Sequence, residues 1–262
     1  MRVRFAGLSD VGRNRTNNED NLFISRHEPI CVVADGMGGH KSGEVASEIA
    51  VKTFRDIYDT ALSDPHLREL LRDRAPAWPF KRRQPEHAEE RRLVQATLLA
   101  NQLIFDHAST QPDCRGMGTT LVGGYFLESS MYLVHVGDSR AYRLRAGRLE
   151  RVTKDHSLAD EYLALGLLSS DEADGFAYKN VITRAMGLHP VVEPEVASLP
   201  VLPGDLFLFC SDGLTDPLND AQIATILGHY GTEIDQASRA LIDAANAGGG
   251  PDNITVILAA IR

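Results

Sequence analysis

The sequence contains the segment Ile30-Cys31-Val32-Val33-Ala34-Asp35-Gly36-Met37-Gly38-Gly39-His40, a short apolar run that ends in an aspartate and several glycines. Ile30–Ala34 has the length and the β-branched, apolar composition of a buried strand. An aspartate followed by glycine is typical of the turn that closes such a strand. We therefore predict a buried strand that ends at Asp35, with a glycine-rich loop after it.

The same kind of run, apolar and closed by Gly, Asp or Asn, recurs along the chain. The other predicted strands are Thr119–Leu127, Met131–Val136, Ala141–Leu144, Asp205–Cys210 and Ile254–Ile261. Apolar residues at helical spacing predict helices over Gly43–Leu62, Glu90–His107, Asp220–Gly228 and Ile234–Ala247. Because strands follow one another and helices come before and after them, the order favours an α+β layered sandwich with antiparallel sheets over βαβ units.

Two segments have weak periodicity. Residues 64–90 contain four prolines and the basic cluster Lys81-Arg82-Arg83, which predicts an extended, solvated insertion between two helices and leaves open a surface for docking a partner. Residues 155–178 predict a partly helical excursion over one edge of the fold.

Composition excludes several classes of protein. The chain has 262 residues, 43% of them hydrophobic, and its net charge of -9 argues against a general binder of nucleic acid or anionic membranes. The N-terminus has no apolar signal core, and no run approaches the roughly 18 apolar residues of a spanning helix. The three cysteines are far apart, and two lie in apolar runs, which is typical of reduced core thiols. We expect a cytoplasmic protein.

Acidic residues fall next to the ends of the predicted strands. The five aspartates concerned are Asp20, Asp35, Asp138, Asp212 and Asp252. One aspartate at a strand end is usually a turn former, because its side chain binds the backbone two residues on. Five of them support a second interpretation, in which the strand ends converge on one rim and the carboxylates bind hard cations such as Mg²⁺ or Mn²⁺. Gly36 would let a backbone carbonyl approach such an ion closely.

Two nucleotide-binding interpretations of the glycine-rich segment fail. A phosphate-binding P-loop needs a glycine directly before Lys-Ser, and His40 occupies that position before Lys41 and Ser42. A dinucleotide-binding fingerprint needs a βαβ unit with an acidic residue about twenty positions further on, and the following sequence does not have that form.

Seven motifs, in order, resemble the metal-dependent protein phosphatases of the 2C type in their bacterial branch. They are Ser9-Asp10-Val11-Gly12; Arg15 with Asn18-Glu19-Asp20; Val33-Ala34-Asp35-Gly36-Met37-Gly38-Gly39-His40 with Gly43-Glu44; Gly116-Met117-Gly118-Thr119-Thr120; His135-Val136-Gly137-Asp138-Ser139-Arg140; Ser211-Asp212-Gly213-Leu214-Thr215-Asp216; and Asp252-Asn253-Ile254-Thr255. The resemblance covers nearly the whole chain. It implies a four-layer αββα sandwich, two antiparallel sheets flanked by helices, forming a single catalytic domain over residues 1–262 with a flap at about residues 153–180.

The resemblance also implies a ligand set for two Mn²⁺ or Mg²⁺ ions. Asp35 corresponds to the carboxylate that bridges both ions, and Asp212 and Asp252 complete the shell of the first. The carbonyl of Gly36 and Asp20, the latter directly or through water, serve the second.

The resemblance also implies residues that bind a weaker third ion and residues that bind the substrate phosphate. Asp138 together with Asp212 corresponds to the pair that holds the third ion in bacterial members. Arg15 matches the arginine that binds the substrate phosphate, for which a planar guanidinium fork is suited.

The implied reaction is direct attack of a metal-activated water on a phosphate monoester, without a covalent enzyme intermediate. Asp35 and Arg15 are then catalytic, and His40 is a candidate general acid for the leaving alcohol, with water held by the metal as the competing donor. In many eukaryotic members a histidine stands at the position of Met37, so that role is not transferred by position.

Other polar residues in the motifs receive structural interpretations. We interpret Arg140 as a scaffold residue paired with a carboxylate, Asn253 as orienting Asp252 or capping a turn, and Glu44 as bracketing the first helix. For His156, at the start of the flap segment, a gating role and a solvated loop are both open.

The predicted substrates are phosphoserine and phosphothreonine proteins, with a Ser/Thr kinase or its targets as partner. We expect a monomer that binds neither nucleic acid nor membrane. Two other functions stay open at this point: a pseudoenzyme that binds metal or phosphopeptide without turnover, and a phosphatase or phosphodiesterase for small molecules.

Overall fold

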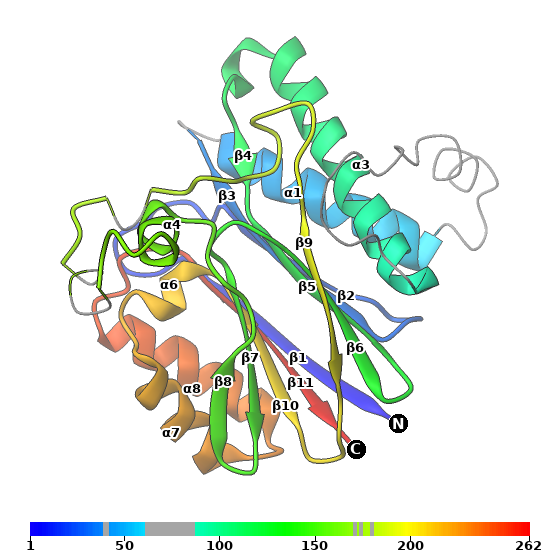
Figure 1. The fold of residues 1–262 in the computed structure, drawn as a ribbon, viewed down its shortest axis with the longest axis vertical. Coiled ribbons are helices and arrows are strands. Elements are labelled where there is room, and N and C mark those ends of the chain that lie inside the picture. The colour runs from blue at the N-terminus through cyan, green and yellow to red at the C-terminus, as the bar shows by residue number, and fades with distance from the viewer. Residues whose placement is uncertain (39–41, 61–86, 170–171, 173–174, 179–180) are drawn as a thin grey trace.

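Two antiparallel β-sheets form the centre of the molecule in this computed structural model, which describes residues 1–38, 42–60, 87–169, 172, 175–178 and 181–262. The first sheet has the strand order β1 (Val3–Asp10), β11 (Ile254–Ile261), β10 (Leu206–Cys210), β7 (Arg140–Arg145) and β8 (Arg148–Arg151). The second has the order β2 (Asp20–Ile24), β3 (Ile30–Met37), β5 (Leu121–Leu127), β6 (Ser130–Val136) and β9 (Glu195–Pro200), and β4 (Gly118–Thr119) pairs with β3. Figure 1 shows the two sheets facing each other.

The inner layer between the sheets is filled by side chains of alternating strand residues. Cys31, Val33 and Val122 from the second sheet contact Phe207 and Phe209 from the first. Each fully buried side chain of this size contributes about 1.5–3 kcal/mol through the apolar surface that it removes from water. Because successive strand residues point to opposite faces, the intervening residues of each strand face the helices instead.

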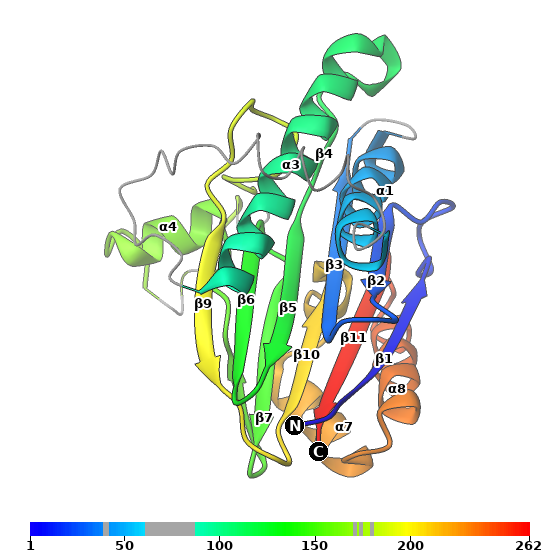
Figure 2. The same ribbon diagram turned by 90° about the vertical axis from the view of Figure 1, so that its right-hand side faces the viewer.

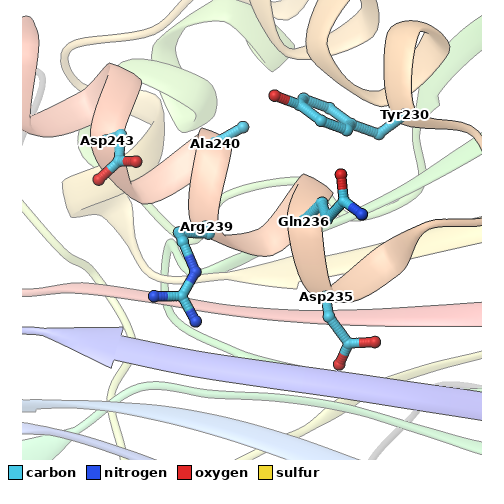
Figure 3. A pocket seen from close by; sticks show the side chains of 6 residues that line it. All are labelled: Tyr230, Asp235, Gln236, Arg239, Ala240 and Asp243. Atoms are coloured by element: carbon cyan, nitrogen blue, oxygen red, sulfur yellow. The ribbon is translucent and has the colours of Figure 1, made fainter.

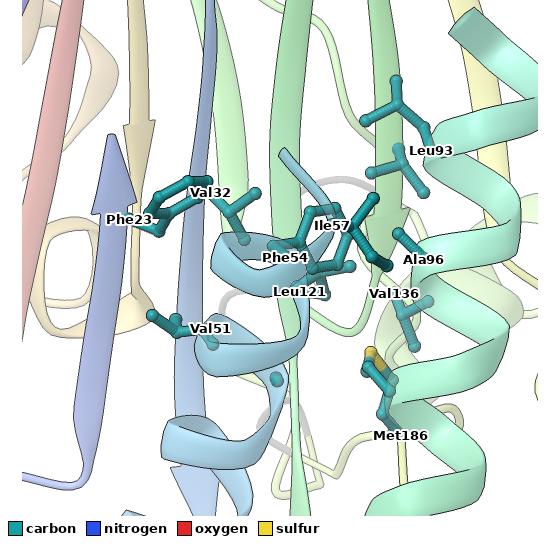
Figure 4. Packing of buried hydrophobic residues seen from close by; sticks show 14 of the residues in the cluster. Phe23, Val32, Val51, Phe54, Ile57, Leu93, Ala96, Leu121, Val136 and Met186 are labelled. Atoms are coloured by element: carbon teal, nitrogen blue, oxygen red, sulfur yellow. The ribbon is translucent and has the colours of Figure 1, made fainter. Parts of the chain in front are cut away.

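Helices cover the outer face of each sheet, as Figure 2 shows from the side. The second sheet is covered by α1 (Ser42–Arg55), which continues as a π-helical turn over Asp56–Thr60, and by α3 (Ala88–Thr110). In Figure 4, Phe54 and Ile57 lie between Val32 and Leu121 on one side and Leu93 of α3 on the other. The first sheet is covered by α7 (Asp220–Tyr230) and α8 (Ile234–Ala247).

This arrangement confirms the predicted α+β sandwich with two antiparallel sheets flanked by helices. The last strand and the helix before it have the predicted bounds, Ile254–Ile261 and Ile234–Ala247. The helix predicted over Glu90–His107 is longer at both ends.

The predicted end of the third strand is wrong. β3 continues through Asp35 and Gly36 to Met37, because Gly118–Thr119 pairs with Gly36 and Met37 and extends the ladder. That partner lies far away in the sequence, so the local turn signal of Asp35-Gly36 is overridden. A Cβ on Gly36 would lie 2.0 Å from the carbonyl oxygen of Gly43, so only glycine fits this crossing.

Two predicted segments lie partly outside the described residues, the first of them almost entirely. Of the insertion predicted over residues 64–90, only the end is described, and it forms the start of α3. The flap predicted at about residues 153–180 contains the short helix α4 (Leu158–Ala164), which agrees with the partly helical interpretation. Within the part of the chain that the structure describes, no helix is long and apolar enough to cross a membrane.

Candidate active site

The five aspartates lie at one end of the sandwich. Asp20 begins β2 and Asp35 lies in β3; Asp138 follows β6, Asp212 begins the short helix α6 (Asp212–Thr215) after β10, and Asp252 precedes β11. In antiparallel sheets the starts of some strands and the ends of their neighbours share one edge, which brings these positions together. In Figure 1 this end carries α4 and α6, and the two termini lie at the opposite end.

Asp20 and Asp35 are cross-strand partners in the register of β2 and β3. Directly opposite residues have Cβ atoms about 4.5–5.5 Å apart on the same face of a sheet. Ser211 links this pair to the other sheet, because its Oγ donates a hydrogen bond of 2.7 Å to Asp20 Oδ2. The Ser211 Oγ also accepts a hydrogen bond of 2.9 Å from the backbone N–H of Thr255, at the start of β11.

Burial and mutual repulsion make these carboxylates hard to ionise without a cation. The pKa of Asp35 is raised well above its usual range, first by burial and then by the charges of Asp20, Asp212 and Asp138. Burial raises the pKa of Asp20 to about 6, against the lowering effect of the hydrogen bond from Ser211. Burial raises the pKa of Asp212 well above its usual range too, with Asp138 as the next cause. The cluster therefore favours a positive charge in its centre.

Three carboxylate oxygens of the cluster are buried and have no hydrogen-bond partner among the described residues. They are Asp20 Oδ1, Asp138 Oδ1 and Asp212 Oδ1. A buried carboxylate oxygen without a donor is costly, and a divalent cation removes that cost. Because every candidate side chain is an oxygen donor, the set fits the hard ions Mg²⁺ and Mn²⁺.

Arg15 lies at the edge of the same cluster. Its Nη2 donates a hydrogen bond of 2.7 Å to Asp252 Oδ2, and its side chain is 50% exposed. A guanidinium has five N–H donors. Those not engaged by Asp252 are available for an anion that enters from solvent.

Residues 10–243 match the family described as Protein phosphatase 2C. The chain is 37% identical to the serine/threonine phosphatase stp of Listeria innocua over 255 residues, which are 95% of this chain and 92% of the relative. The chain belongs to the protein phosphatase 2C family.

Solved structures agree with this assignment. The Mycobacterium tuberculosis serine/threonine phosphatase PstP/Ppp has a TM-score of 0.82 at 34% identity over 99% of both chains. A structure of the catalytic domain of PstP in complex with 2 manganese ions has a TM-score of 0.81 at 34% identity, covering 99% of this chain and 98% of that one. The chain is thus a serine/threonine phosphatase of the metal-dependent phosphatase 2C family.

The N-terminal segment of this phosphatase is held in place by Asn253. The Oδ1 of Asn253 accepts a hydrogen bond of 2.8 Å from the N–H of Glu19, and its Nδ2 donates to the carbonyls of Val11 and Asn17 at 2.9 Å each. The backbone N–H of Asn253 donates a hydrogen bond of 2.8 Å to Asp252 Oδ1, which agrees with the interpretation that Asn253 orients Asp252. Its side chain also fixes the segment that carries Arg15 and leads to Asp20.

The start of the segment that is predicted to be a flap is buried in this phosphatase. Asp155 is 6% exposed and His156 is 7% exposed, so the solvated-loop interpretation of His156 is wrong. Asp155 accepts hydrogen bonds from Arg140 Nε at 3.0 Å and Arg140 Nη2 at 2.7 Å, which confirms the interpretation of Arg140 as a scaffold residue paired with a carboxylate. The first turn of α1 contains Glu44, which accepts a hydrogen bond of 3.1 Å from Asn17.

Sequence reasoning missed three residues that build this site. Ser211 donates to Asp20, Thr120 binds both the N–H and the C=O of Asp35 through its own side chain and N–H, and Asp155 holds Arg140. Ser211 and Thr120 belong to two of the seven family motifs, and that membership could have marked them as site residues. His40 lies outside the described residues.

A surface hollow of about 350 Å³ lies on α7 and α8; Figure 3 labels its lining residues Tyr230, Asp235, Gln236, Arg239, Ala240 and Asp243. Its two aspartates lie on exposed helix surface. Arg239 and Asp243 are therefore suitable positions for control substitutions.

Proposed function

We propose that this phosphatase hydrolyses phosphoserine and phosphothreonine in proteins at the aspartate cluster. The observation that carries the proposal is a set of three buried carboxylate oxygens, with no hydrogen-bond partner in the described part of the chain, near an arginine that is half exposed. Two divalent cations, Mn²⁺ or Mg²⁺, would be held there. Asp35 would bridge them, with Asp212 and Asp252 serving one ion and Asp20 and the Gly36 carbonyl serving the other.

A third, weaker ion would be held by Asp138 and Asp212. The charge of Asp138 is the largest cause, after burial, of the raised pKa of Asp212, which supports a shared ion between the two side chains. When bound, the cations neutralise the carboxylates and the phosphate dianion and lower the pKa of a bound water toward neutrality.

The protein's own groups position the substrate. Arg15 reaches the cluster through Asp252 and would direct its remaining N–H donors at two phosphoryl oxygens, where negative charge develops. The phosphoryl group passes directly to water, so no side chain carries a covalent phosphate. His40 is our candidate for protonating the leaving alcohol.

The residues 153–180 would act as a flap beside this cluster. Asp155 supports that position, because its charge is the second cause, after burial, that raises the pKa of Asp138 to about 6. The partner would be a protein phosphorylated by a Ser/Thr kinase. The phosphatase would act on it as a monomer in the cytoplasm. The free thiols of Cys31, Cys114 and Cys210 suit that reducing compartment.

The test is hydrolysis of p-nitrophenyl phosphate and of a phosphothreonine peptide, before and after removal of metal and with Mn²⁺ restored. We expect metal-dependent phosphate release from both substrates and a loss of about 10²-fold or more in Asp212→Asn, since removing one ligand charge costs several kcal/mol. Asp243→Asn, the same change on exposed α8, should behave as wild type. Turnover of sugar phosphates or diesters in preference to the peptide would instead assign a small-molecule phosphatase.

Replacing Arg15 by alanine is expected to raise KM for the phosphopeptide by about 10- to 100-fold, because a charge-assisted hydrogen bond contributes about 1.5–3 kcal/mol. Arg15→Lys keeps the charge without the fork and should recover only part of the loss. Arg239→Ala on α8 is the matched control. Because Arg15 also pairs with Asp252, Mn²⁺ affinity must be measured in parallel. A loss confined to kcat would show that Arg15 acts in the transition state alone.

A further inference from the structure

His156 binds both the backbone N–H and the backbone carbonyl of Gly137, at the rim of the aspartate cluster. Its backbone N–H donates a hydrogen bond of 2.8 Å to the carbonyl of Gly137. The N–H of Gly137 in turn donates a buried hydrogen bond of 3.0 Å to the Nδ1 of the His156 ring. Gly137 directly precedes Asp138, the predicted ligand of the third ion. A histidine that begins the flap segment therefore holds the turn that carries a metal-binding carboxylate.

The hydrogen bond from Gly137 determines which ring nitrogen of His156 carries the proton. Nδ1 accepts from an N–H, so it has a free lone pair and the proton of the neutral ring is on Nε2. Nε2 lies 3.2 Å from Glu195 Oε2, which accepts that proton's hydrogen bond. Arg184 Nη1, 3.1 Å from Nε2, has the carbonyl of Glu193 as its acceptor at 3.1 Å.

This protonation state argues against a separate metal site at the same place. His135, His156 and Glu195 bring ligand atoms within 4.8 Å of one another, which is the spacing of a metal-binding set. The lone pair of His156 is used by Gly137, however, and the guanidinium of Arg184 stands beside Nε2. A cation would meet an N–H and a positive charge, so the role of His156 lies in its hold on Gly137.

The turn that contains Gly137 has little freedom to adapt. Gly137 has φ +105, and a Cβ there would lie 2.7 Å from Thr120 Cγ2, so only glycine fits. On the far side of Asp138, the hydroxyls of Ser139 and Thr120 share a hydrogen bond of 2.7 Å. Thr120 Oγ1 also accepts from the N–H of Asp35 at 3.0 Å. His156 and Thr120 thus hold the turn from two sides, and Thr120 connects it to β3.

His156 is also attached to both stems of the flap segment. Its carbonyl accepts a hydrogen bond of 2.8 Å from the N–H of Thr183. The next residue, Ser157, forms an antiparallel bridge with Ile182. The chain that leaves the site at His156 and the chain that returns at Thr183 are therefore joined at the residue that holds Gly137.

We propose that His156 is a positioning residue: by holding Gly137 it fixes the Asp138 carboxylate in the aspartate cluster and makes the affinity of the weakest divalent cation depend on the stems of the flap segment. This inference rests on the proposed function, because it assigns Asp138 to that ion. Partners of metal ligands typically change metal affinity by about 10- to 100-fold when they are removed.

Substituting His156 by asparagine or by glutamine distinguishes the role of Nδ1 from that of Nε2. His156→Asn places a carbonyl oxygen at the position of Nδ1 and can still accept from Gly137. His156→Gln places its amide at the position of Nε2 and loses that acceptor, and His156→Ala loses both. The measurements are a calorimetric Mn²⁺ titration and the exchange rate of the Gly137 amide, read by NMR in the metal-free protein.

We expect His156→Gln and His156→Ala to weaken the weakest Mn²⁺ by about 10- to 100-fold and to leave the tighter ions within about 3-fold. The Gly137 amide should exchange at least 10-fold faster in both, and His156→Asn should recover most of both effects. If Asn and Gln variants bind the weakest Mn²⁺ equally, or if the Gly137 amide is unchanged in His156→Gln, the positioning role is overturned.

The amide measurement keeps this outcome separate from a failure of the proposed function. It needs neither metal nor turnover, so it tests the hold of His156 on Gly137 even in an inactive sample. A wild type without Mn²⁺-dependent hydrolysis would overturn the proposed function. An active wild type whose weakest Mn²⁺ is insensitive to His156→Gln would overturn the inference alone.

Discussion

Asp35→Asn is expected to reduce kcat/KM for the phosphothreonine peptide by about 10³-fold or more, because it removes the charge that would be shared by both core cations. A loss of about 4 kcal/mol of transition-state stabilisation corresponds to this factor. The same substitution should make the metal-free protein more stable at pH 8, since burial and four neighbouring aspartates oppose the charge of Asp35. Opposite effects on activity and on metal-free stability are the signature of a metal ligand.

The measurements for Asp35→Asn are steady-state kinetics at saturating Mn²⁺, calorimetric Mn²⁺ binding, and urea unfolding after metal removal. Asp243→Asn on the exposed surface of α8 is the control and should change none of the three. A Mn²⁺ titration that matches wild type would refute the bridging role of Asp35. So would a metal-free variant that is less stable than wild type at pH 8.

Removing the metal is expected to abolish turnover and to reverse the usual rise of stability with pH above pH 4. The pKa values of Asp20 and Asp138 are raised to about 6 in the folded protein, chiefly by burial, from 3.8. Between these values the folded state binds more protons than the unfolded state, so its free energy of unfolding falls as pH rises through the folded pKa. A shift of about two pKa units corresponds to about 3 kcal/mol for one such group.

The melting temperature of the metal-free protein should therefore fall by on the order of 5–10 °C between pH 5 and pH 8, since about 1 kcal/mol shifts it by about 2–4 °C in a chain of this size. Mn²⁺ at pH 8 should restore it, because a ligand that binds only the folded state stabilises that state. Asp35→Asn, with fewer repelling charges, should show a shallower decline. A metal-free melting temperature that rises steadily from pH 5 to pH 8 would contradict the charge repulsion in the cluster.

The local pattern of apolar and turn residues was sufficient to predict most of the strands and helices. Ile254–Ile261 and Ile234–Ala247 were predicted with their observed bounds, because apolar period and the turn residues around them are contained within each segment. The position of β4 was not predictable in the same way. Two residues, Gly118–Thr119, have too little pattern of their own, and their pairing with β3 is the reason that this strand continues past Asp35.

In the site, too, the sequence identified residues, whereas the fold decided which of them are in contact. Asp20 and Asp35 were both singled out in the sequence, but their pairing depends on the register of β2 and β3. Ser211 and Asp20 are 191 positions apart and meet only because the two sheets pack against each other. The local sequence around His156 fits a solvated loop as well as a buried position. Its contact with Gly137 and its exposure of only 7% show that the position is buried.

The sequence by itself determined the alternation of strands and helices, the family resemblance, and the five aspartates beside strand ends, because each depends on residue type and short-range spacing. The tertiary structure decided which aspartates face each other, which of their oxygens are buried without a partner, and which side chains hold the turns that carry them. The physical reason is that ionisation and hydrogen bonding depend on the loss of water around a group. In this protein that loss is produced by segments from distant parts of the chain.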